Sequence, residues 1–293
     1  MRGRLRGIAG LAALGLLAAA CGGGDPPGFD TPESALHDPV ADVYLVSNIR
    51  GAPTAKDGNG YIARVQPDGS MQRFWIEGGR DGVTLHAPKG LALAGETLWV
   101  ADIDVVRRFD RSSGAPRGEV AIPGATFLND VSAGLDGAVY VTDSGLDASF
   151  LPTGTDAIWR IAADGAVTPV LRSLELGQPN GLVAQKTGLY VVSWRDGTFS
   201  QVGFDGVRTE LGKVPTGQVD GLVRVPGEAA GGGAPFWLLT SWAGKCVYRF
   251  DVTGAITRLP GVHEQPADCG FDAVRRRVLL PLFGRNRLEL LPL

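Results

Sequence analysis

One short phrase, in which a polar residue opens an apolar run, recurs along this chain. Its clearest copies are Pro179-Asn180-Gly181-Leu182-Val183 and Val219-Asp220-Gly221-Leu222-Val223. Looser copies bring the number to six, and the polar residues that open them are Glu33, Lys89, Asn129, Asn180, Asp220 and Asp268. Successive copies lie roughly 40–55 residues apart, and a recurrence at that spacing is typical of a propeller or a solenoid.

Each repeat also contains denser apolar runs that predict strands. One kind is nearly continuously apolar, which favours strands covered on both faces, and spans residues 43–47, 98–102, 139–143, 189–193, 237–241 and 278–282. A second kind follows it at residues 61–65, 105–109, 158–161, 199–202 and 246–250. Asp-Gly pairs, a strong hairpin signal, follow three of these runs at residues 68–69, 164–165 and 205–206.

Six repeats of four strands predict an all-β chain, folded as a six-bladed β-propeller over residues 29–293. The last repeat ends after three strands, so we expect a strand from residues 28–31 to complete it and close the ring. No segment after residue 21 has a sustained helical period with caps, and we predict no long helix. The 43 glycines and 19 prolines agree with a fold of many short strands and turns.

The charge of the chain excludes one class of function. Its 28 Lys and Arg stand against 31 Asp and Glu, a formal net charge of −3. There is no basic excess with which to bind nucleic acid. We expect a monomer whose partner is a small-molecule substrate.

Residues 1–21 resemble an export signal. Arginines at three of the first six positions precede an apolar segment, residues 8–20, that is too short to span a bilayer. With Cys21 following, the arrangement resembles a bacterial lipoprotein signal, although Ala18 stands where that signal usually has Leu. An ordinary secretory signal is the alternative. In the lipoprotein case residues 22–28 form a flexible tether, and the lipid anchor attaches the protein to a membrane surface facing the periplasm or the cell exterior.

Two further cysteines, Cys246 and Cys269, belong to the expected propeller. Export permits a disulfide, but each lies in an apolar run, where a lone cysteine commonly packs as a small hydrophobe. Because the two runs belong to different blades, we predict that these cysteines are not bonded.

In a propeller the first strand of each blade lines the central channel, so one polar residue at the same phase of every blade points at one axis. The recurring set supplies carboxylates and amide carbonyls but no thiol. Oxygen-only ligands suit a hard cation such as Ca²⁺, and Glu33 and Asp220 together would neutralise a divalent ion. Two plainer interpretations stay open: the residues cap the starts of strands, or the channel holds only water and structural hydrogen bonds.

Four of these phrases resemble the metal-site phrases of the senescence-marker-protein/gluconolactonase family, the regucalcin-like lactonases, and the resemblance covers roughly residues 31–293. They begin at Pro32-Glu33, Asn129-Asp130, Asn180-Gly181 and Asp220-Gly221. The resemblance implies that Glu33, Asn180 and Asp220 bind one divalent metal. It also implies that Asn129 contacts the metal's water or the substrate, and that Asp220 is the proton shuttle.

The sequence departs from the family at two matched positions. Ser34-Ala35 follows the glutamate where Gly-Pro is frequent, and Phe127 stands where sugar-lactone hydrolases of the family have an arginine. Lys89 has no ligand role in the family. The metal site is therefore better supported than a sugar substrate.

The chemistry that these residues imply is hydrolysis of an ester or a lactone, with Asp220 as base and Lys89 as added positive charge. A serine mechanism is disfavoured, because Gly-x-Ser-x-Gly is absent and the three histidines, expected in loops or at the surface, share no phase with a serine. Trp194 and Trp242 end successive strands and either line an apolar pocket or pack between blades. The alternative function is a non-catalytic binding or scaffold module at the cell surface.

Overall fold

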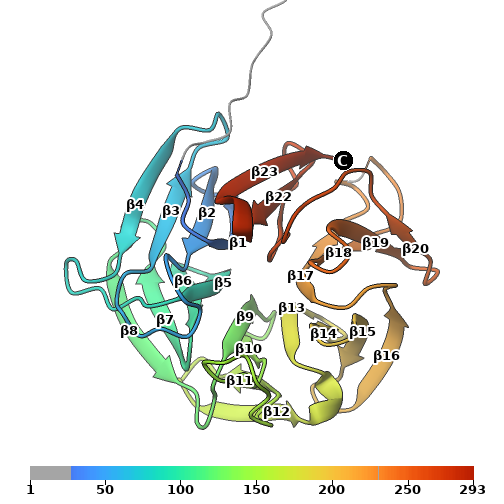
Figure 1. Ribbon diagram of the computed structural model, residues 1–293, viewed down its shortest axis with the longest axis horizontal. Coiled ribbons are helices and arrows are strands. Elements are labelled where there is room, and N and C mark those ends of the chain that lie inside the picture. The colour runs from blue at the N-terminus through green and yellow to red at the C-terminus, as the bar shows by residue number, and fades with distance from the viewer. Residues whose placement is uncertain (1–27, 230) are drawn as a thin grey trace, which may run out of the picture.

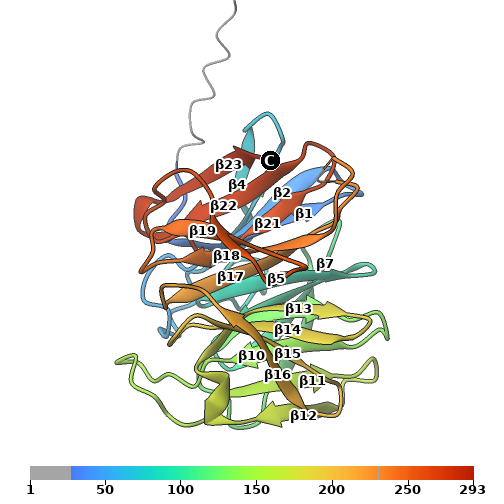
Figure 2. The same ribbon diagram turned by 90° about the vertical axis from the view of Figure 1, so that its right-hand side faces the viewer.

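A computed structural model describes residues 28–229 and 231–293, and it confirms the six-bladed β-propeller. Six antiparallel sheets surround a central channel, and the first strand of each sheet lies nearest the axis (Figure 1). In the edge view of Figure 2, the strands of the fifth blade lie between those of the fourth and the sixth. The blades therefore pack face to face around the ring. The N-terminal segment, residues 1–27, lies outside the described residues.

The elements follow one another as four-stranded blades, except for the last. In chain order they are β1 (Pro32–Asp38), β2 (Val43–Asn48), β3 (Tyr61–Val65), β4 (Met71–Glu77), β5 (Pro88–Ala94), β6 (Thr97–Asp102), β7 (Val105–Asp110), β8 (Pro116–Ala121), β9 (Leu128–Ala133), β10 (Val139–Asp143), β11 (Ala157–Ile161), β12 (Val167–Arg172), the 3₁₀ turn η1 (Leu174–Leu176), β13 (Pro179–Gln185), β14 (Gly188–Ser193), β15 (Thr198–Val202), β16 (Arg208–Lys213), β17 (Val219–Val225), β18 (Phe236–Ser241), β19 (Cys246–Asp251), β20 (Ile256–Arg258), β21 (Gly270–Asp272), β22 (Arg277–Leu282), the 3₁₀ turn η2 (Phe283–Arg285) and β23 (Arg287–Pro292).

The second strands carry the hydrophobic core, as their apolar sequences predict. All residues of β2 and β10 are buried, because each strand is covered by the neighbouring blade on either side. One core cluster joins Ala92 of the second blade to Val131 and Val141 of the third. The outer strands are polar, and most residues of β8 are exposed. The core therefore lies between the blades, and the channel is left to other side chains.

The ring does not close with the strand expected from residues 28–31. The sixth blade has three strands, β21–β23. Thr31 has a left-handed backbone conformation, with φ at 49°. Its carbonyl oxygen accepts a hydrogen bond from Ile49 N at the end of β2. This turn directs the chain along the first blade, although Phe29 still packs against Leu279 and Leu288 of the sixth.

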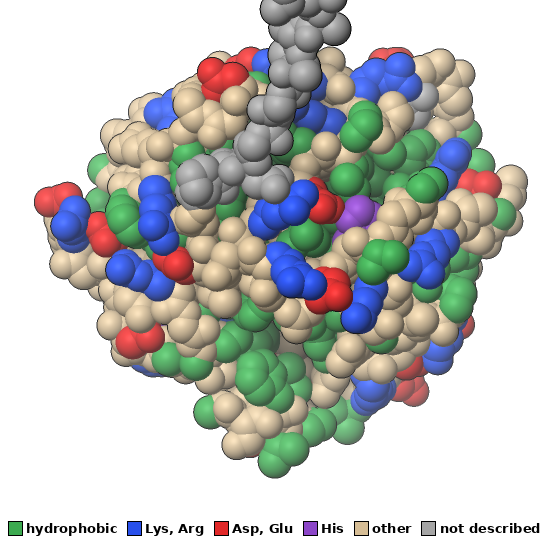
Figure 3. Space-filling model, turned by 45° about the horizontal axis from the view of Figure 1, so that its top comes forward, with side chains coloured by type: hydrophobic (Ala, Val, Ile, Leu, Met, Phe, Trp, Pro, Cys, Tyr) green, Lys and Arg blue, Asp and Glu red, His purple; other side chains and the backbone are tan. Residues whose placement is uncertain are grey.

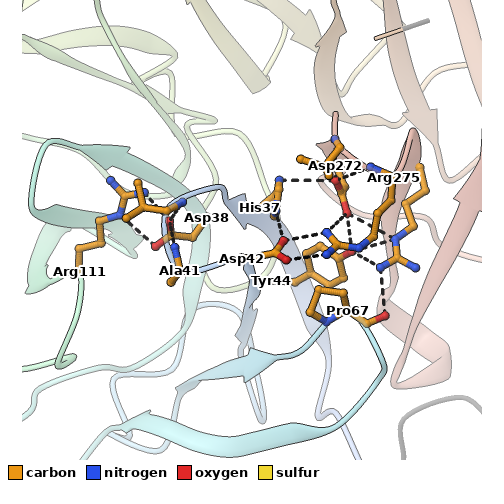
Figure 4. A network of polar contacts seen from close by, with 12 residues as sticks. His37, Asp38, Ala41, Asp42, Tyr44, Pro67, Arg111, Asp272 and Arg275 are labelled. Atoms are coloured by element: carbon orange, nitrogen blue, oxygen red, sulfur yellow. Dashed lines mark hydrogen bonds and ion pairs between the residues drawn. The ribbon is translucent and has the colours of Figure 1, made fainter. Parts of the chain in front are cut away.

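Backbone hydrogen bonds of Asp268 with Glu33 and Ala35, at 2.9 and 3.3 Å, join the first and sixth blades, and side chains add to them. Arg275 of the β21–β22 turn binds both carboxylate oxygens of Asp42 in the first blade, at 2.7 and 2.5 Å. Tyr44 Oη donates to Asp272 at 2.6 Å. Figure 4 shows this set, with His37 beside it. We call His37, Asp42, Tyr44, Asp272 and Arg275 the seam.

A β-bulge at the start of the first strand is the local feature that shapes the channel. In five blades the register between first and second strands shifts at this point, for example between Pro179 and Leu182. The shift places two residues opposite one, which bends the strand and re-aims a side chain. The displaced residues include Glu33, Lys89, Asn129, Asn180 and Asp220. The recurring polar residue is therefore the bulged residue.

Hydroxyl groups of the second strands satisfy several of these bulges. Thr240 Oγ1 accepts from Gly221 N at 2.7 Å, and Thr142 Oγ1 accepts from Asp130 N at 2.9 Å. The glycine after Asp220 is required by space, because a Cβ at Gly221 would lie 2.6 Å from Cys269 N. The bulges are thus built from residues that a plain strand would not need.

The cysteines agree with the sequence expectations, and one histidine does not. Cys246 and Cys269 are both buried free thiols, in the core clusters of different blades. The expectation for the histidines is wrong for His37, which is buried in β1. Within residues 28–229 and 231–293, no helix is long and apolar enough to cross a membrane.

Candidate metal centre

The bulged residues form the floor of a large pocket at one mouth of the channel. Its volume is about 920 Å³. Glu33, Lys89, Asn129, Asn180 and Asp220 all line it, so the fold brings together every residue predicted for the site. Five different blades supply them, at the same phase of their first strands.

Three oxygen atoms on this floor are buried without a hydrogen-bond partner. They are Glu33 Oε2, Asn180 Oδ1 and Asp220 Oδ1. The side chains that carry them are only 6%, 3% and 3% exposed. Buried polar atoms in folded proteins are nearly always paired, so an unpaired group at such a place needs an explanation. These are the three residues that the sequence predicts as metal ligands.

The electrostatics of the floor disfavour the charged carboxylates. Burial raises the pKa of Glu33 well above its usual value, and the charge of Asp220 raises it further, whereas Lys89 lowers it. Burial also raises the pKa of Asp220, and the charge of Asp268 adds to it, against the polar groups of Trp242 and Asn180. A cation among these oxygens would favour the ionised forms.

Lys89 is fixed at the edge of the floor. It is 1% exposed, and its Nζ donates to the carbonyl oxygens of Pro53 and Ala87 at 3.0 and 3.1 Å. The ammonium also lies 4.5 Å from the ring centroid of Phe127. Burial lowers the pKa of Lys89, while Glu33 and Asp102 raise it. Phe127 therefore supports a lysine from the neighbouring blade.

Asn129 is oriented by a chain of hydrogen bonds. Its Nδ2 donates to Ser144 Oγ at 3.1 Å, and that hydroxyl donates to the carbonyl oxygen of Pro179 at 2.7 Å. Because the amide nitrogen is engaged, the amide oxygen is the group left for a ligand in the pocket. Ser144 was not predicted, since its role depends on the pairing of two blades.

The donor set fits a hard divalent cation. Two carboxylates and one amide oxygen supply the hard ligands that Ca²⁺ prefers, with water and substrate to complete its ~6–8 oxygens. Among the described residues there is no group of three or more His, Cys, Asp and Glu side chains suited to a metal ion. The floor has two carboxylates, and its third candidate ligand is the amide of Asn180.

Asp268 does not lie with this set. Its Oδ2 accepts from Ser34 Oγ at 2.5 Å, and burial raises its pKa to about 7. It lines a smaller cavity at the other mouth of the channel together with Asp130, which the sequence pattern did not single out. Asp130 accepts from Leu182 N at 2.6 Å. Asp130 directly follows the floor residue Asn129, and Asp268 occupies the matching position in the sixth blade. Both carboxylates face away from the floor.

Trp194 and Trp242 line the large pocket, as one of the two sequence interpretations held. Their ring centroids are 5.2 Å apart, in an edge-to-face arrangement. Histidines take no part in the floor: His86 Nδ1 accepts from Gly58 N at 3.0 Å, and His263 Nδ1 lies 2.7 Å from Glu289 Oε2. These contacts leave the chemistry of the floor to oxygen ligands and Lys89.

Comparisons with known proteins relate the fold to several solved structures. A gluconolactonase from Xanthomonas campestris matches with a TM-score of 0.68 at 18% identity, over 90% of this chain and 86% of that one. A protein named provisionally as a gluconolactonase matches at 0.66 and 19%, over 92% of both chains. Virginiamycin B lyase from Staphylococcus aureus matches at 0.65 and 15%, over 92% of this chain and 97% of that one.

The sequence comparisons found less. No protein-family model matches this chain, and no curated protein matches it. At identities below 20%, the structural likeness shows a shared fold, because propellers host many unrelated functions. The comparisons therefore show that this chain shares its overall fold with these structures.

Proposed function

We propose that this chain is a metal-dependent hydrolase of a lactone or a related ester. The observation that carries the proposal is the group of three buried, unpaired oxygens of Glu33, Asn180 and Asp220 on the floor of a large pocket. A buried charge without a partner costs free energy, and a bound divalent cation, Ca²⁺ by its ligand preference, would remove that cost. A purely structural channel does not need such a group.

Each floor residue has a role that follows from its surroundings. The cation, when bound, supplies Lewis acidity toward a carbonyl oxygen and a lower pKa for water. Asp220 takes the proton of the attacking water, because its carboxylate lies on the pocket floor beside the place where that water would be bound. Asn129 orients that water or the substrate through its free amide oxygen. Lys89 holds a positive charge beside the oxygen that becomes negative during attack.

The proposal includes a place in the cell and a mode of action. Residues 1–21 act as a lipoprotein signal, and Cys21 carries the lipid that holds the propeller on a membrane surface outside the cytoplasm. The folded part acts as a monomer on a small-molecule substrate. Metabolic labelling with a fatty acid tests the anchor: the wild type should incorporate label, and Cys21→Ala should not.

A panel of lactones and esters, assayed before and after removal of metal, tests the activity. The proposal expects hydrolysis of at least one lactone, loss of that activity with a chelator, and its return with Ca²⁺ or another divalent cation. If no lactone or ester is opened and added metal leaves the melting temperature unchanged, the activity is wrong. The protein would then be a binding or scaffold module.

A further inference from the structure

The walls of the pocket differ in character from its floor. Above the metal ligands they are formed largely by Phe127, Leu146, Phe150, Trp194, Trp242 and Phe283. These side chains contact one another in two groups. Trp242 lies between Trp194 and Phe283, with centroid distances of 5.2 and 5.1 Å, and Phe127 lies 6.0 Å from Phe150. In Figure 3, hydrophobic side chains gather around a hollow in the lower half of the face shown.

Several polar groups of the walls are engaged with the protein, although Trp242 Nε1 is buried without a hydrogen-bond partner. Ser144 donates its hydroxyl proton to a backbone carbonyl. Lys245 pairs with Glu264 at 3.5 Å, and Glu264 also binds Arg285 at 2.9 Å. A sugar lactone needs a partner for each hydroxyl group that it buries. An apolar ligand needs only area, which the aromatic walls provide.

One wall residue occupies a position that ordinarily belongs to glycine. Phe150 has φ at 59°, in the left-handed region, where a bulky residue is rare. It closes a tight hairpin turn in which Asp147 Oδ1 accepts from the backbone N–H groups of Ser149 and Leu151, at 2.8 and 2.9 Å. Glycine is the usual choice at the left-handed position of such a turn. A strained aromatic there points to a function for the ring.

The ring of Phe150 is also half exposed, at 52%, and the adjacent Leu151 is 60% exposed. An exposed phenyl group at the rim of a cavity loses water contact only when a ligand covers it. The strain and the exposure therefore have one explanation in common, a ligand that packs on this ring.

We infer that the ligand of this pocket carries a sizeable apolar group, and that Phe150 selects for it. The inference rests on the proposed function in that the reacting ligand is a lactone or an ester. The reacting carbonyl lies over the floor, and an alkyl or aryl substituent lies along the aromatic walls toward Phe150. Phe150 is a specificity-determining residue, because it contacts the substituent and not the reacting atoms.

The test compares two variants of the full mature protein. Phe150→Gly removes the ring at a position where glycine is the favoured residue, so the variant should melt no lower than the wild type. Arg276→Gly is the matched control, since Arg276 also has a left-handed φ, of 52°, but does not line the pocket. The substrates are a δ-lactone with a long alkyl chain, the same ring without the chain, and glucono-δ-lactone.

The wild type should have the highest kcat/KM with the alkyl lactone. The ratio of kcat/KM for the alkylated over the unsubstituted ring should fall about tenfold in Phe150→Gly, the effect of losing one apolar contact surface, and should not change in Arg276→Gly. A preference for glucono-δ-lactone, or an unchanged ratio in a folded Phe150→Gly protein, would overturn the inference and leave the hydrolase proposal standing.

A binding measurement separates the two proposals if no lactone is opened. The alkyl δ-lactam has the same shape and resists hydrolysis, and its binding is followed by the fluorescence of Trp194 and Trp242. Binding to the wild type that weakens in Phe150→Gly supports the apolar ligand even where the hydrolase proposal fails. Absence of binding at millimolar lactam, together with absence of turnover, contradicts both.

Discussion

Two regions of this propeller are rich in carboxylates, and they treat the carboxyl group in opposite ways. On the pocket floor, burial raises the pKa of Glu33 and of Asp220. At the seam between the first and sixth blades, hydrogen bonds from Arg275 lower the pKa of Asp42 to about 2. Asp42 is half exposed, so its burial differs too, but Asp272 of the seam is as buried as the floor carboxylates and shows the effect of partners alone.

The seam supplies a partner for each acidic oxygen (Figure 4). Asp272 is fully buried, and burial alone would raise its pKa, but hydrogen bonds from Tyr44 and Arg275 outweigh that and lower it. It also accepts from the backbone N–H groups of Val274 and Arg275, both at 2.9 Å. The floor supplies no arginine and leaves three oxygens unpaired. The seam carboxylates, which have hydrogen-bond partners, hold the first and sixth blades together. The floor carboxylates, which have unpaired oxygens, are suited to bind a cation.

The largest expected effect is a loss of activity when a carboxylate of the floor is replaced. Asp220→Asn should lower kcat/KM toward a lactone that the wild type opens by about 100- to 10,000-fold, because it removes the base and weakens the metal site. Steady-state kinetics with saturating Ca²⁺ measure this. Retention of more than about a tenth of the activity would contradict the role of Asp220 as base.

The second effect is a loss of stability when a carboxylate of the seam is replaced. Asp272→Ala should lower the free energy of unfolding by about 3–5 kcal/mol, because it leaves the buried Tyr44 hydroxyl and two backbone N–H groups without an acceptor and Arg275 without one of its two carboxylates. Chemical denaturation measures the loss. Metal affinity at the floor should not change, and a loss below about 1 kcal/mol would show that the seam does not hold the ring.

A matched substitution on the floor should act in the opposite direction. In the metal-free protein, Glu33→Gln replaces a buried carboxylate by a neutral group of the same shape. The free energy of unfolding should rise by about 1 kcal/mol, the size of a common single-residue effect, whereas added Ca²⁺ should stabilise the variant less than the wild type. If metal-free Glu33→Gln is clearly less stable than the wild type, the carboxylate has a structural partner and the comparison fails.

The smallest effect is a pH dependence of the seam. Because the folded pKa of Asp42 is lowered to about 2, the unfolded chain, with an ordinary pKa of about 3.9, takes up the proton first as the pH falls. The stabilisation from Asp42 is therefore complete above about pH 4 and is lost as the pH falls through about 2. As the pH falls through this range, the melting temperature should drop less steeply for Asp42→Asn than for the wild type. Equal slopes would contradict the lowered pKa of Asp42.

The sequence predicts the strands well, but it predicts the pairing between strands less well. Residues 61–65 and 139–143 form strands with the predicted bounds, because their apolar runs are local signals. The bulges were not predicted, since two residues opposite one is a property of pairing between strands. Asp268 was matched one residue out of phase for the same reason, as its phase is set by Ser34 and Leu222 of neighbouring blades.

The seam was also not predicted. Asp42 and Arg275 are separated by almost the whole propeller, and nothing local to either residue marks the other. The expected closing strand failed because Thr31 turns the chain toward β2. The five floor residues, by contrast, were singled out from the sequence because each repeats at one phase of a periodic pattern, and the structure places all five in one pocket. Their binding of a metal stays a prediction.

The central claim is that Glu33, Asn180 and Asp220 bind one divalent cation. Isothermal titration of Ca²⁺ into the chelator-stripped wild type, Asp220→Asn and Asp42→Asn tests it most directly. The account predicts one site per chain in the wild type, the same affinity in Asp42→Asn, and at least about tenfold weaker binding in Asp220→Asn. No heat of binding in the wild type, or an Asp220→Asn protein that binds as tightly as the wild type, would contradict it.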